Sequence, residues 1–273
     1  MKIEILLSAM NQSDLSLFEK SKCCTNLLII NQTDHEGYEE SQRNGCKIRM
    51  YSTTQRGLSR SRNMALVHAL GDICLFADDD CVMAEGYEKL IEGAFKRHPD
   101  AAAIAFNYND PNRRSKKAKI IETECIAPKN KSFSSVSLAF RRSEIQRKGI
   151  WFNVNLGAGS GFISAGEETV WEDDLRRSGL NLYQCPDYIT EVQQQNSTWF
   201  TGYNEKYFYD LGAVLSLRYN SFAKYLYQFY YPIRLKGDTE MSIVKQIKYM
   251  IAGMQGIKKG LNYEQYFKIN EKI

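Results

Sequence analysis

Long hydrophobic runs are absent from the sequence. Its apolar stretches, such as residues 27–30 and 73–77, fall far short of the roughly 20 residues that a membrane-spanning helix needs. The first eight residues contain one basic residue, an apolar patch interrupted by Glu4, and no small-residue cleavage site. We therefore expect no transmembrane helix, no secretion signal and a cytoplasmic location.

Cysteine pairs and histidine clusters are missing as well. The seven cysteines contain no C-x-x-C pair and have no nearby histidine, and the three histidines are isolated from one another. This pattern offers no zinc site and, with an odd number of cysteines, predicts reduced and mostly buried thiols. We expect structural or solvent-exposed roles for His35, His68 and His98.

The charge is modest in total and uneven along the chain. The formal net charge is +4, and no nucleic-acid partner is expected. Residues 199–261 contain nine Lys or Arg and four Asp or Glu, so much of the basic surplus lies in the C-terminal quarter.

Short apolar segments alternate with helix-like segments over the first hundred residues. Strands are predicted at residues 2–9, 26–30, 47–51, 73–77 and 101–106. Helices are predicted at residues 14–20, 58–70 and 86–97. This order predicts a mostly parallel sheet with helices on both faces, which binds ligands at the carboxyl ends of its strands.

The pattern changes after residue 110 and becomes helical again from residue 199. One repeating face is formed by Leu211, Val214, Leu215, Arg218, Phe222, Tyr225, Leu226 and Phe229. A last amphipathic stretch has Ile243, Ile247, Met250, Ile251, Met254 and Ile257 on one side. The ordinary interpretation of such a stretch is a helix packed on the domain.

Three adjacent aspartates, Asp78, Asp79 and Asp80, directly follow the apolar segment 73–77. Adjacent carboxylates at a strand end repel one another unless a cation or strong donors neutralise them. Mg²⁺ or Mn²⁺ binds through one or two carboxylates and takes its other ligands from water and substrate phosphates. The cluster therefore predicts a metal-bridged diphosphate. Two alternatives stay open: solvated acids that cap the next helix, and the Asp78-x-Asp80-x-Val82 nucleophile motif of haloacid-dehalogenase-like phosphatases.

A longer set of motifs resembles family 2 glycosyltransferases, which have the GT-A fold. The segment 56–66, which contains Gly57, Arg62 and Asn63, is similar to the Gly-x-x-x-(Ala/Ser)-Arg-Asn segment that precedes the Asp-x-Asp strand in that family. Gly57 allows a tight turn before a helix, and the guanidinium of Arg62 can pair with phosphate. The resemblance covers roughly residues 1–200.

A later segment resembles the family's Gly-Glu-Asp motif. Gly166, Glu167 and Glu168 are followed by Gly179 and a strand-like segment at 180–183. The resemblance implies that Glu168 replaces the family's catalytic aspartate as general base, with Glu167 second as a ligand on the acceptor side. Asp173 and Asp174 are alternatives that fit the spacing to Gly179 poorly, and a third interpretation is surface acids that begin a helix. The loop at residues 157–161 is expected near the acceptor.

The resemblance also implies where the nucleoside binds. Ser8 and Asn11 end the first strand, and Asn31 and Gln32 end the second, where family members hold the nucleoside. Amides stand where many relatives have an aspartate. Gln193, Gln194 and Gln195 occupy the candidate sites of a family histidine that precedes Ser-Ser or Ser-Thr, here Ser197 and Thr198.

Together these features predict an α/β protein with a GT-A fold: a mixed central sheet flanked by helices and a helical C-terminal extension. The catalytic domain is expected at residues 1–198, with a nucleotide-sugar half at 1–110 and an acceptor half at 111–198, and the extension at 199–273. The resemblance implies inverting sugar transfer from a nucleotide sugar, with a UDP-sugar as the expected donor, in polysaccharide or glycolipid synthesis. Asp78 and Asp80 would hold Mg²⁺ or Mn²⁺, and Ser8, Asn11, Asn31, Gln32, Arg62, Asp78 and Asp79 would bind the donor. The alternatives are the phosphatase and a noncatalytic nucleotide-binding protein.

Two further hypotheses concern the acceptor. Trp151 and Trp171 flank the acceptor motif and are candidates for stacking on a sugar, with burial as the ordinary alternative. Because many relatives use lipid-linked acceptors, we also hypothesise peripheral contact with an anionic membrane. The basic residues Arg113, Arg114, Lys116, Lys117 and Lys119 and the amphipathic stretch within residues 240–273 would provide that contact.

Overall fold

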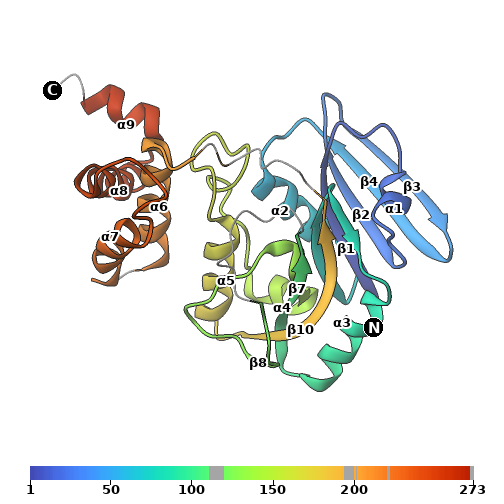
Figure 1. Cartoon of the computed structure of the whole chain (residues 1–273). Helices are drawn as coiled ribbons and strands as arrows, with labels where there is room; N and C mark the ends of the chain where they lie inside the picture. Colours follow the sequence, from blue (N-terminus) through green and yellow to red (C-terminus); the bar gives the residue numbers. More distant parts are fainter. Residues whose placement is uncertain (111–119, 194–199, 201, 220–221, 271–273) are drawn as a thin grey trace.

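A computed structural model describes residues 1–110, 120–193, 200, 202–219 and 222–270 (Figure 1). Its strands are β1 (Ile3–Met10), β2 (Asn26–Gln32), β3 (Gly37–Arg43), β4 (Cys46–Thr53), β5 (Ile73–Asp78), β6 (Cys81–Met83), β7 (Ala101–Asn109), β8 (Cys125–Ile126), β9 (Leu138–Arg141) and β10 (Asn181–Val192). Its helices are α1 (Leu17–Lys20), α2 (Leu58–His68), α3 (Tyr87–Arg97), α4 (Arg142–Lys148), α5 (Glu167–Arg177), α6 (Glu205–Arg218), α7 (Ala223–Arg234), α8 (Ile243–Lys258) and α9 (Tyr263–Asn270). A short 3₁₀ helix, η1 (Ser135–Ser137), precedes β9.

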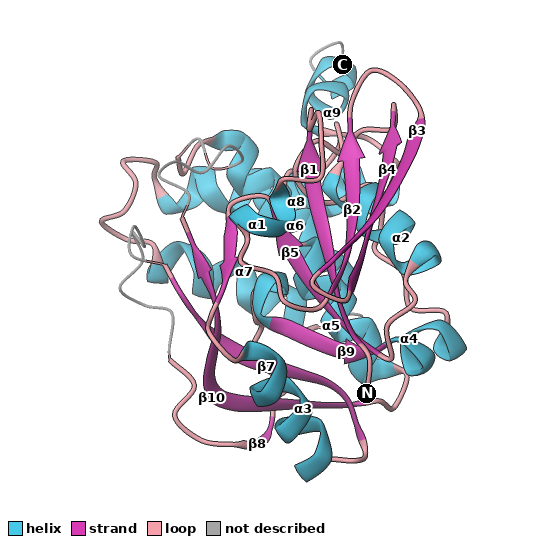
Figure 2. Ribbon diagram, turned by 90° about the vertical axis from the view of Figure 1, so that its right-hand side faces the viewer, coloured by secondary structure: helices cyan, strands magenta, loops and turns pink. Residues whose placement is uncertain are grey.

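The strands form one ten-stranded mixed sheet in the order β3-β4-β2-β1-β5-β9-β7-β10-β6, with β8 paired to β10 (Figures 1 and 2). The neighbours β4, β2, β1 and β5 run parallel, and Ser8 is in register with both Ile30 and Asp78. The carboxyl ends of these strands therefore meet at one edge of the sheet. Ligands of open α/β sheets bind at such an edge.

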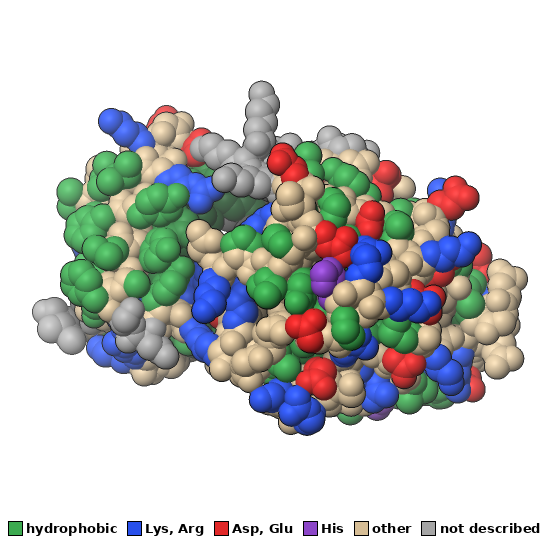
Figure 3. Space-filling model, turned by 90° about the horizontal axis from the view of Figure 1, so that it is seen from below, with side chains coloured by type: hydrophobic (Ala, Val, Ile, Leu, Met, Phe, Trp, Pro, Cys, Tyr) green, Lys and Arg blue, Asp and Glu red, His purple; other side chains and the backbone are tan. Residues whose placement is uncertain are grey.

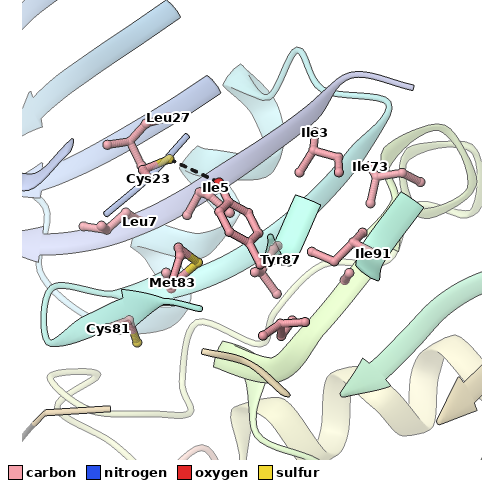
Figure 4. Packing of buried hydrophobic residues seen from close by; sticks show 14 of the residues in the cluster. Ile3, Ile5, Leu7, Cys23, Leu27, Ile73, Cys81, Met83, Tyr87 and Ile91 are labelled. Carbon is pink, nitrogen blue, oxygen red and sulfur yellow. Dashed lines mark hydrogen bonds between the residues drawn. The ribbon is translucent and has the colours of Figure 1, made fainter. Parts of the chain in front are cut away.

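Both faces of the sheet are buried, because side chains alternate between two apolar clusters. On β1, Ile5 and Leu7 belong to the cluster beneath α1 and α3, while Leu6 belongs to the cluster beneath α2, α4 and α5. Figure 4 shows the first cluster, in which Tyr87 of α3 reaches toward the Cys23 thiol, 3.6 Å from its hydroxyl. Strands with two buried faces give continuous apolar segments in the sequence.

The predicted α/β fold with a mixed sheet is confirmed, and the five predicted strands correspond to β1, β2, β4, β5 and β7. These five strands all run in one direction, whereas the whole sheet is mixed, because β3, β6, β8 and β9 each pair antiparallel with their neighbours. The edge strand β3 was not predicted because its residues are exposed and polar, so they carry no apolar alternation. The predicted helix at residues 14–20 is only the short α1.

The C-terminal helices lie to one side of the sheet, next to α5 (Figure 1). The face predicted to continue from residue 211 to 229 belongs to two helices, since α6 ends at Arg218 and α7 begins at Ala223. The expected boundary between residues 198 and 199 lies outside the described residues. So do the basic run at 113–119, the candidate histidine positions Gln194 and Gln195, and Ser197 and Thr198.

Helices α6 and α8 approach each other closely through glycines. A Cβ atom on Gly253 would overlap the backbone carbonyl of Tyr209, and one on Gly212 would overlap the backbone of Met250. Neither backbone can move without separating the two helices. Glycine is therefore required at this contact for steric reasons.

We expect Gly253→Ala to lower the free energy of unfolding by about 2 kcal/mol, because the added methyl forces the two backbones apart. Denaturant unfolding would measure this. Gly93→Ala is the matched control: Gly93 is also helical, and its added Cβ would meet only the flexible end of Arg97 at 3.3 Å. The control should be neutral or more stable by up to about 1 kcal/mol. Equal stability of the two variants would contradict the close-packing argument.

Candidate active site

The three aspartates lie where β5 ends at the carboxyl edge of the sheet. Asp78 is the last residue of β5, and Cys81 begins β6 directly after Asp80. The next helix, α3, begins only at Tyr87, and its N-cap is Gly86, six residues after Asp80. The aspartates therefore do not cap that helix, while Asp79 is exposed to solvent.

The electrostatic environment of the aspartates is unfavourable for three negative charges. Burial, followed by the charges of Asp78 and Asp79, raises the pKa of Asp80 to about 6. Burial and Asp78 also raise the pKa of Asp79. Carboxylates with raised pKa values at a strand end are a frequent property of functional sites.

Arg62 connects this cluster to the acids of α5. Its side chain is 1% exposed, and its Nη2 lies 3.5 Å from Oδ1 of Asp78. The same guanidinium lies 3.2 Å from Oε1 of Glu167 and 3.6 Å from Oε1 of Glu168. Burial alone would lower the pKa of Arg62, but these three carboxylates raise it. Arg62 therefore stays charged and holds β5, α2 and α5 together at one point.

Glu167 and Glu168 occupy the first turn of α5, where the helix dipole stabilises negative charge. The preceding Gly166 has a φ of 90°, a left-handed conformation that glycine adopts without strain. Glu167 is 7% exposed, and burial, then the neighbouring Glu168, raises its pKa to about 7. Glu167 is thus not a surface acid, whereas the side chain of Glu168 is 30% exposed.

Ser135 of η1 joins Arg62 to Glu168, a role that the sequence did not predict. The hydroxyl accepts a hydrogen bond from Nη2 of Arg62 at 2.6 Å and donates one to Oε1 of Glu168, also at 2.6 Å. Within the described residues, Oε2 of Glu168 has no hydrogen-bond partner. The side chain of Glu168 is therefore fixed through one oxygen while the other stays available.

The loop at residues 157–161 packs between α2 and α5. The carbonyl of Ala158 accepts a hydrogen bond from the backbone of Leu58 at 2.9 Å. A Cβ on Gly57 would lie 3.2 Å from the carbonyl oxygen of Gly159, and one on Gly157 would lie 3.0 Å from the carboxyl carbon of Glu167. The glycines on both sides allow this approach, which places the loop beside Glu167.

The predicted nucleoside residues differ in their exposure. Asn31 is fully buried and bonds the backbone of Gln12 in both directions at 2.9 Å, while Gln32 accepts from the backbone of Gly57 at 2.7 Å. Ser8 is also buried, beneath the hydroxyl of Ser61. Asn11 is exposed and has a φ of 51°. The amides thus hold the loops after β1 and before α2 in place at the carboxyl edge of the sheet, and Asn11 is the accessible member of the set.

Other predicted residues lie away from this cluster or in the core. Asp173 pairs with Arg218 at 2.8 Å and Asp174 pairs with Arg177 at 2.9 Å, so both are engaged elsewhere. Trp171 is 1% exposed in the core, so it is not a sugar platform, whereas Trp151 is 44% exposed.

The backbone of Gln193 donates to the carbonyl of Asp80 at 3.0 Å, which places the family's candidate histidine position beside the aspartates. The cysteines are free, and five of them are buried as predicted: Cys23, Cys46, Cys74, Cys81 and Cys185. The histidines have structural contacts: His35 with Asp34, His68 stacked on Tyr51, and His98 with Glu124.

The residues around Asp78 fit a divalent cation that is only partly bound by protein. In the described part of the chain, no group of three His, Cys, Asp or Glu side chains is placed to hold a metal ion. Mg²⁺ needs no such group, because it binds through one or two carboxylates and fills its shell with water and phosphate oxygens. Burial, then the neighbouring aspartates, raise the pKa values of Asp79 and Asp80, and a bound cation would favour the ionised form of both.

Comparison with known proteins gives one family match. The model described as Glycosyl transferase family 2 matches residues 26–162, slightly more than half of the chain. The match includes Arg62 and Asp78 to Asp80 and ends before Glu167. A comparison with curated proteins found no match.

Several solved structures have a similar fold. S. aureus TarS 1-349 has a TM-score of 0.59 at 12% identity, over 95% of this chain and 72% of that one. Its complex with UDP has a TM-score of 0.59 at 12% identity, over 98% and 75%. Its complex with UDP-GlcNAc has a TM-score of 0.58 at 11% identity, over 96% and 93%. At these identities the similarity concerns the fold alone.

Proposed function

This chain belongs to glycosyl transferase family 2 and has the GT-A fold, and on that premise we propose that it transfers a sugar from a nucleoside diphosphate donor to an acceptor hydroxyl with inversion. UDP is the nucleotide we propose, since the structures of TarS with UDP and UDP-GlcNAc have the same fold. The proposed acceptor is a saccharide or a lipid-linked saccharide of a surface polysaccharide or glycolipid.

One observation carries this proposal: a single buried arginine touches both the end of β5 and the start of α5. Arg62 lies 3.5 Å from Asp78 and 3.6 Å from Glu168. A transferase must hold the leaving diphosphate and the acceptor's base on opposite sides of one anomeric carbon. Arg62 supports such an arrangement, because it fixes both acidic elements to one rigid point.

The proposed step is a single displacement. The acceptor oxygen forms a bond to the anomeric carbon while the bond from that carbon to the diphosphate oxygen breaks, and Oε2 of Glu168 takes the acceptor's proton. The nucleoside diphosphate leaves with the electron pair of the broken bond. Attack from the face opposite the leaving group inverts the anomeric configuration. Glu168 suits the role of base because its other oxygen is held by Ser135 at 2.6 Å.

A divalent cation, proposed as Mg²⁺ or Mn²⁺, would be held by Asp78 and Asp80 and would neutralise charge on the departing diphosphate. Asp79 and the exposed Asn11 would contact the donor. Arg62 has its guanidinium on carboxylates and Ser135, so we propose that it positions these groups and does not contact phosphate directly.

The phosphatase alternative loses its support with the family assignment. It required Asp78 as nucleophile and left the Arg62 and Glu168 segments without a role. Both segments now have a place in one cluster, and the family match includes the aspartates themselves.

Titration calorimetry of the purified protein with UDP and with GDP, each with and without Mn²⁺, tests the proposal. We expect UDP to bind with Mn²⁺ and GDP to bind at least about tenfold more weakly, a difference of about 1.4 kcal/mol. Omission of Mn²⁺ should weaken UDP binding, because the diphosphate would then face the aspartates without a counter-charge. Absence of binding by either nucleotide would contradict the proposed donor.

A further inference from the structure

Helix α7 presents its most apolar side to solvent. The exposed residues recur at helical spacing and form one stripe, which we call the α7 apolar face: Phe222, Tyr225, Leu226, Phe229, Tyr230 and Ile233. Their exposed fractions range from 44% for Tyr225 to 70% for Phe222. A helix of a globular protein ordinarily turns such a stripe toward the core.

The opposite side of α7 is packed and contains more polar groups. Gln228 is 2% exposed and contacts the sulfur of Met254, and Pro232 is buried. Tyr227 and Tyr231 pack against the cluster that contains Leu235. The helix is thus attached to α6 and α8 through these residues, and the α7 apolar face is left without a partner in the described chain.

Basic residues accompany this face. The segment 222–236 contains Lys224, Arg234 and Lys236 and has no Asp or Glu, and the exposed Asp238 and Glu240 follow in the next loop. Figure 3 shows hydrophobic side chains gathered over the C-terminal helices, with Lys and Arg side chains near the margin of the patch. Contiguous exposed apolar surface of this kind marks an interaction site.

We propose that the α7 apolar face binds an anionic lipid surface. Phe, Leu and Ile side chains insert at the boundary of headgroups and acyl chains, Tyr side chains suit the interface, and basic residues attract anionic headgroups. A second copy of the chain fits this face less well. Self-pairing would bring the three basic residues of each copy together, and the two acids of the following loop, Asp238 and Glu240, would offset them only in part.

The position of this surface differs from the one expected from sequence. The predicted apolar side of the last amphipathic stretch is divided: Met250 and Met254 are buried where α8 packs on α6, whereas Ile243 and Ile251 are exposed. The basic run at 113–119 lies outside the described residues. The inference depends on lipid binding alone and not on which sugar is transferred.

Flotation with vesicles tests the proposal. We expect the full chain to float with vesicles of phosphatidylcholine and phosphatidylglycerol, and to float less with phosphatidylcholine alone. The double variant Phe229→Glu, Ile233→Glu should reduce the bound fraction at limiting lipid by about 100-fold, since two inserted side chains are replaced by charges. Both residues are more than half exposed, at 57% and 64%, so the variant should fold.

The control is Val67→Glu, which places one such charge at a 61% exposed apolar residue of α2. It should float like the unmodified chain. Thermal unfolding of all three proteins verifies that the fold is intact. Failure of the unmodified chain to float, or equal flotation of the double variant, would overturn the proposal. Light scattering measures whether a second copy of the chain binds this face instead. If the unmodified chain is a dimer that does not bind vesicles, and the double variant is a monomer, self-association replaces the lipid proposal.

Discussion

Glu168→Gln is expected to lower kcat for sugar transfer by about 10²–10⁴-fold and to leave the Kd for the donor nucleotide unchanged. Gln has the same shape and still accepts the hydrogen bond from Ser135, but its amide cannot take the acceptor's proton. Because the side chain of Glu168 is 30% exposed, the variant should fold normally. Steady-state kinetics with a UDP-sugar, and calorimetry for donor binding, would separate the two effects.

Two variants make this result specific. Ser135→Ala keeps the carboxylate but removes the group that fixes it, so kcat should fall less than in Glu168→Gln. Asp174→Asn removes an acid from the same helix, paired with Arg177, and should leave kcat unchanged. Full activity of Glu168→Gln together with loss in Glu167→Gln would assign the base to Glu167 instead.

The first half of the fold could be predicted from sequence because its strands are buried on both faces. Such strands, for example β5 with its unbroken apolar residues, are visible as short apolar segments between helical ones. β3 gave no such signal, since it is an exposed edge strand of polar residues. The break between α6 and α7 could not be predicted from the sequence either. The α7 apolar face continues the spacing of the buried residues of α6, and periodicity does not distinguish a buried stripe from an exposed one.

The residues of the candidate site that belong to recognisable motifs could be predicted from the sequence, and the others could not. The order of the segments around Arg62, Asp78 and Glu168 predicted that they belong to one site, and the structure brings the three side chains together. Ser135 had no signal, because a serine in an irregular loop is ordinary in any sequence. The burial of Asn31 and Gln32 likewise depends on loops that fold over them, which strand patterns do not describe.

Asp80→Asn is expected to weaken Mn²⁺-dependent UDP binding by about 100-fold, or about 2.7 kcal/mol. The amide removes one of the two carboxylates proposed to hold the cation. Calorimetric titration with Mn²⁺ and UDP would measure it, and Asp238→Asn, at an exposed loop residue after α7, is the control. Unchanged UDP affinity in Asp80→Asn would contradict a metal role for Asp80. In the unmodified protein, Mn²⁺ binding should weaken below about pH 6, since the ion must then displace a proton from Asp80.

Asp80→Asn should also make the metal-free protein more stable. This result would distinguish an acid that serves function from one that stabilises the fold. Burial, then the charges of Asp78 and Asp79, raises the pKa of Asp80 to about 6, above its ordinary value of 3.8, so the folded state binds the proton more tightly than the unfolded state does. Ionised Asp80 therefore costs folding free energy above pH 6, and this cost disappears as the pH falls below 4. Asn cannot ionise, so in EDTA at neutral pH the variant should unfold about 2 °C higher, a small shift because the group is partly solvated. Calorimetric scans at pH 7.5 and pH 4 would test this. A lower Tm of Asp80→Asn than of the unmodified protein at pH 7.5 would mean that the Asp80 carboxylate stabilises the fold. That result would contradict a destabilising repulsion among the aspartates.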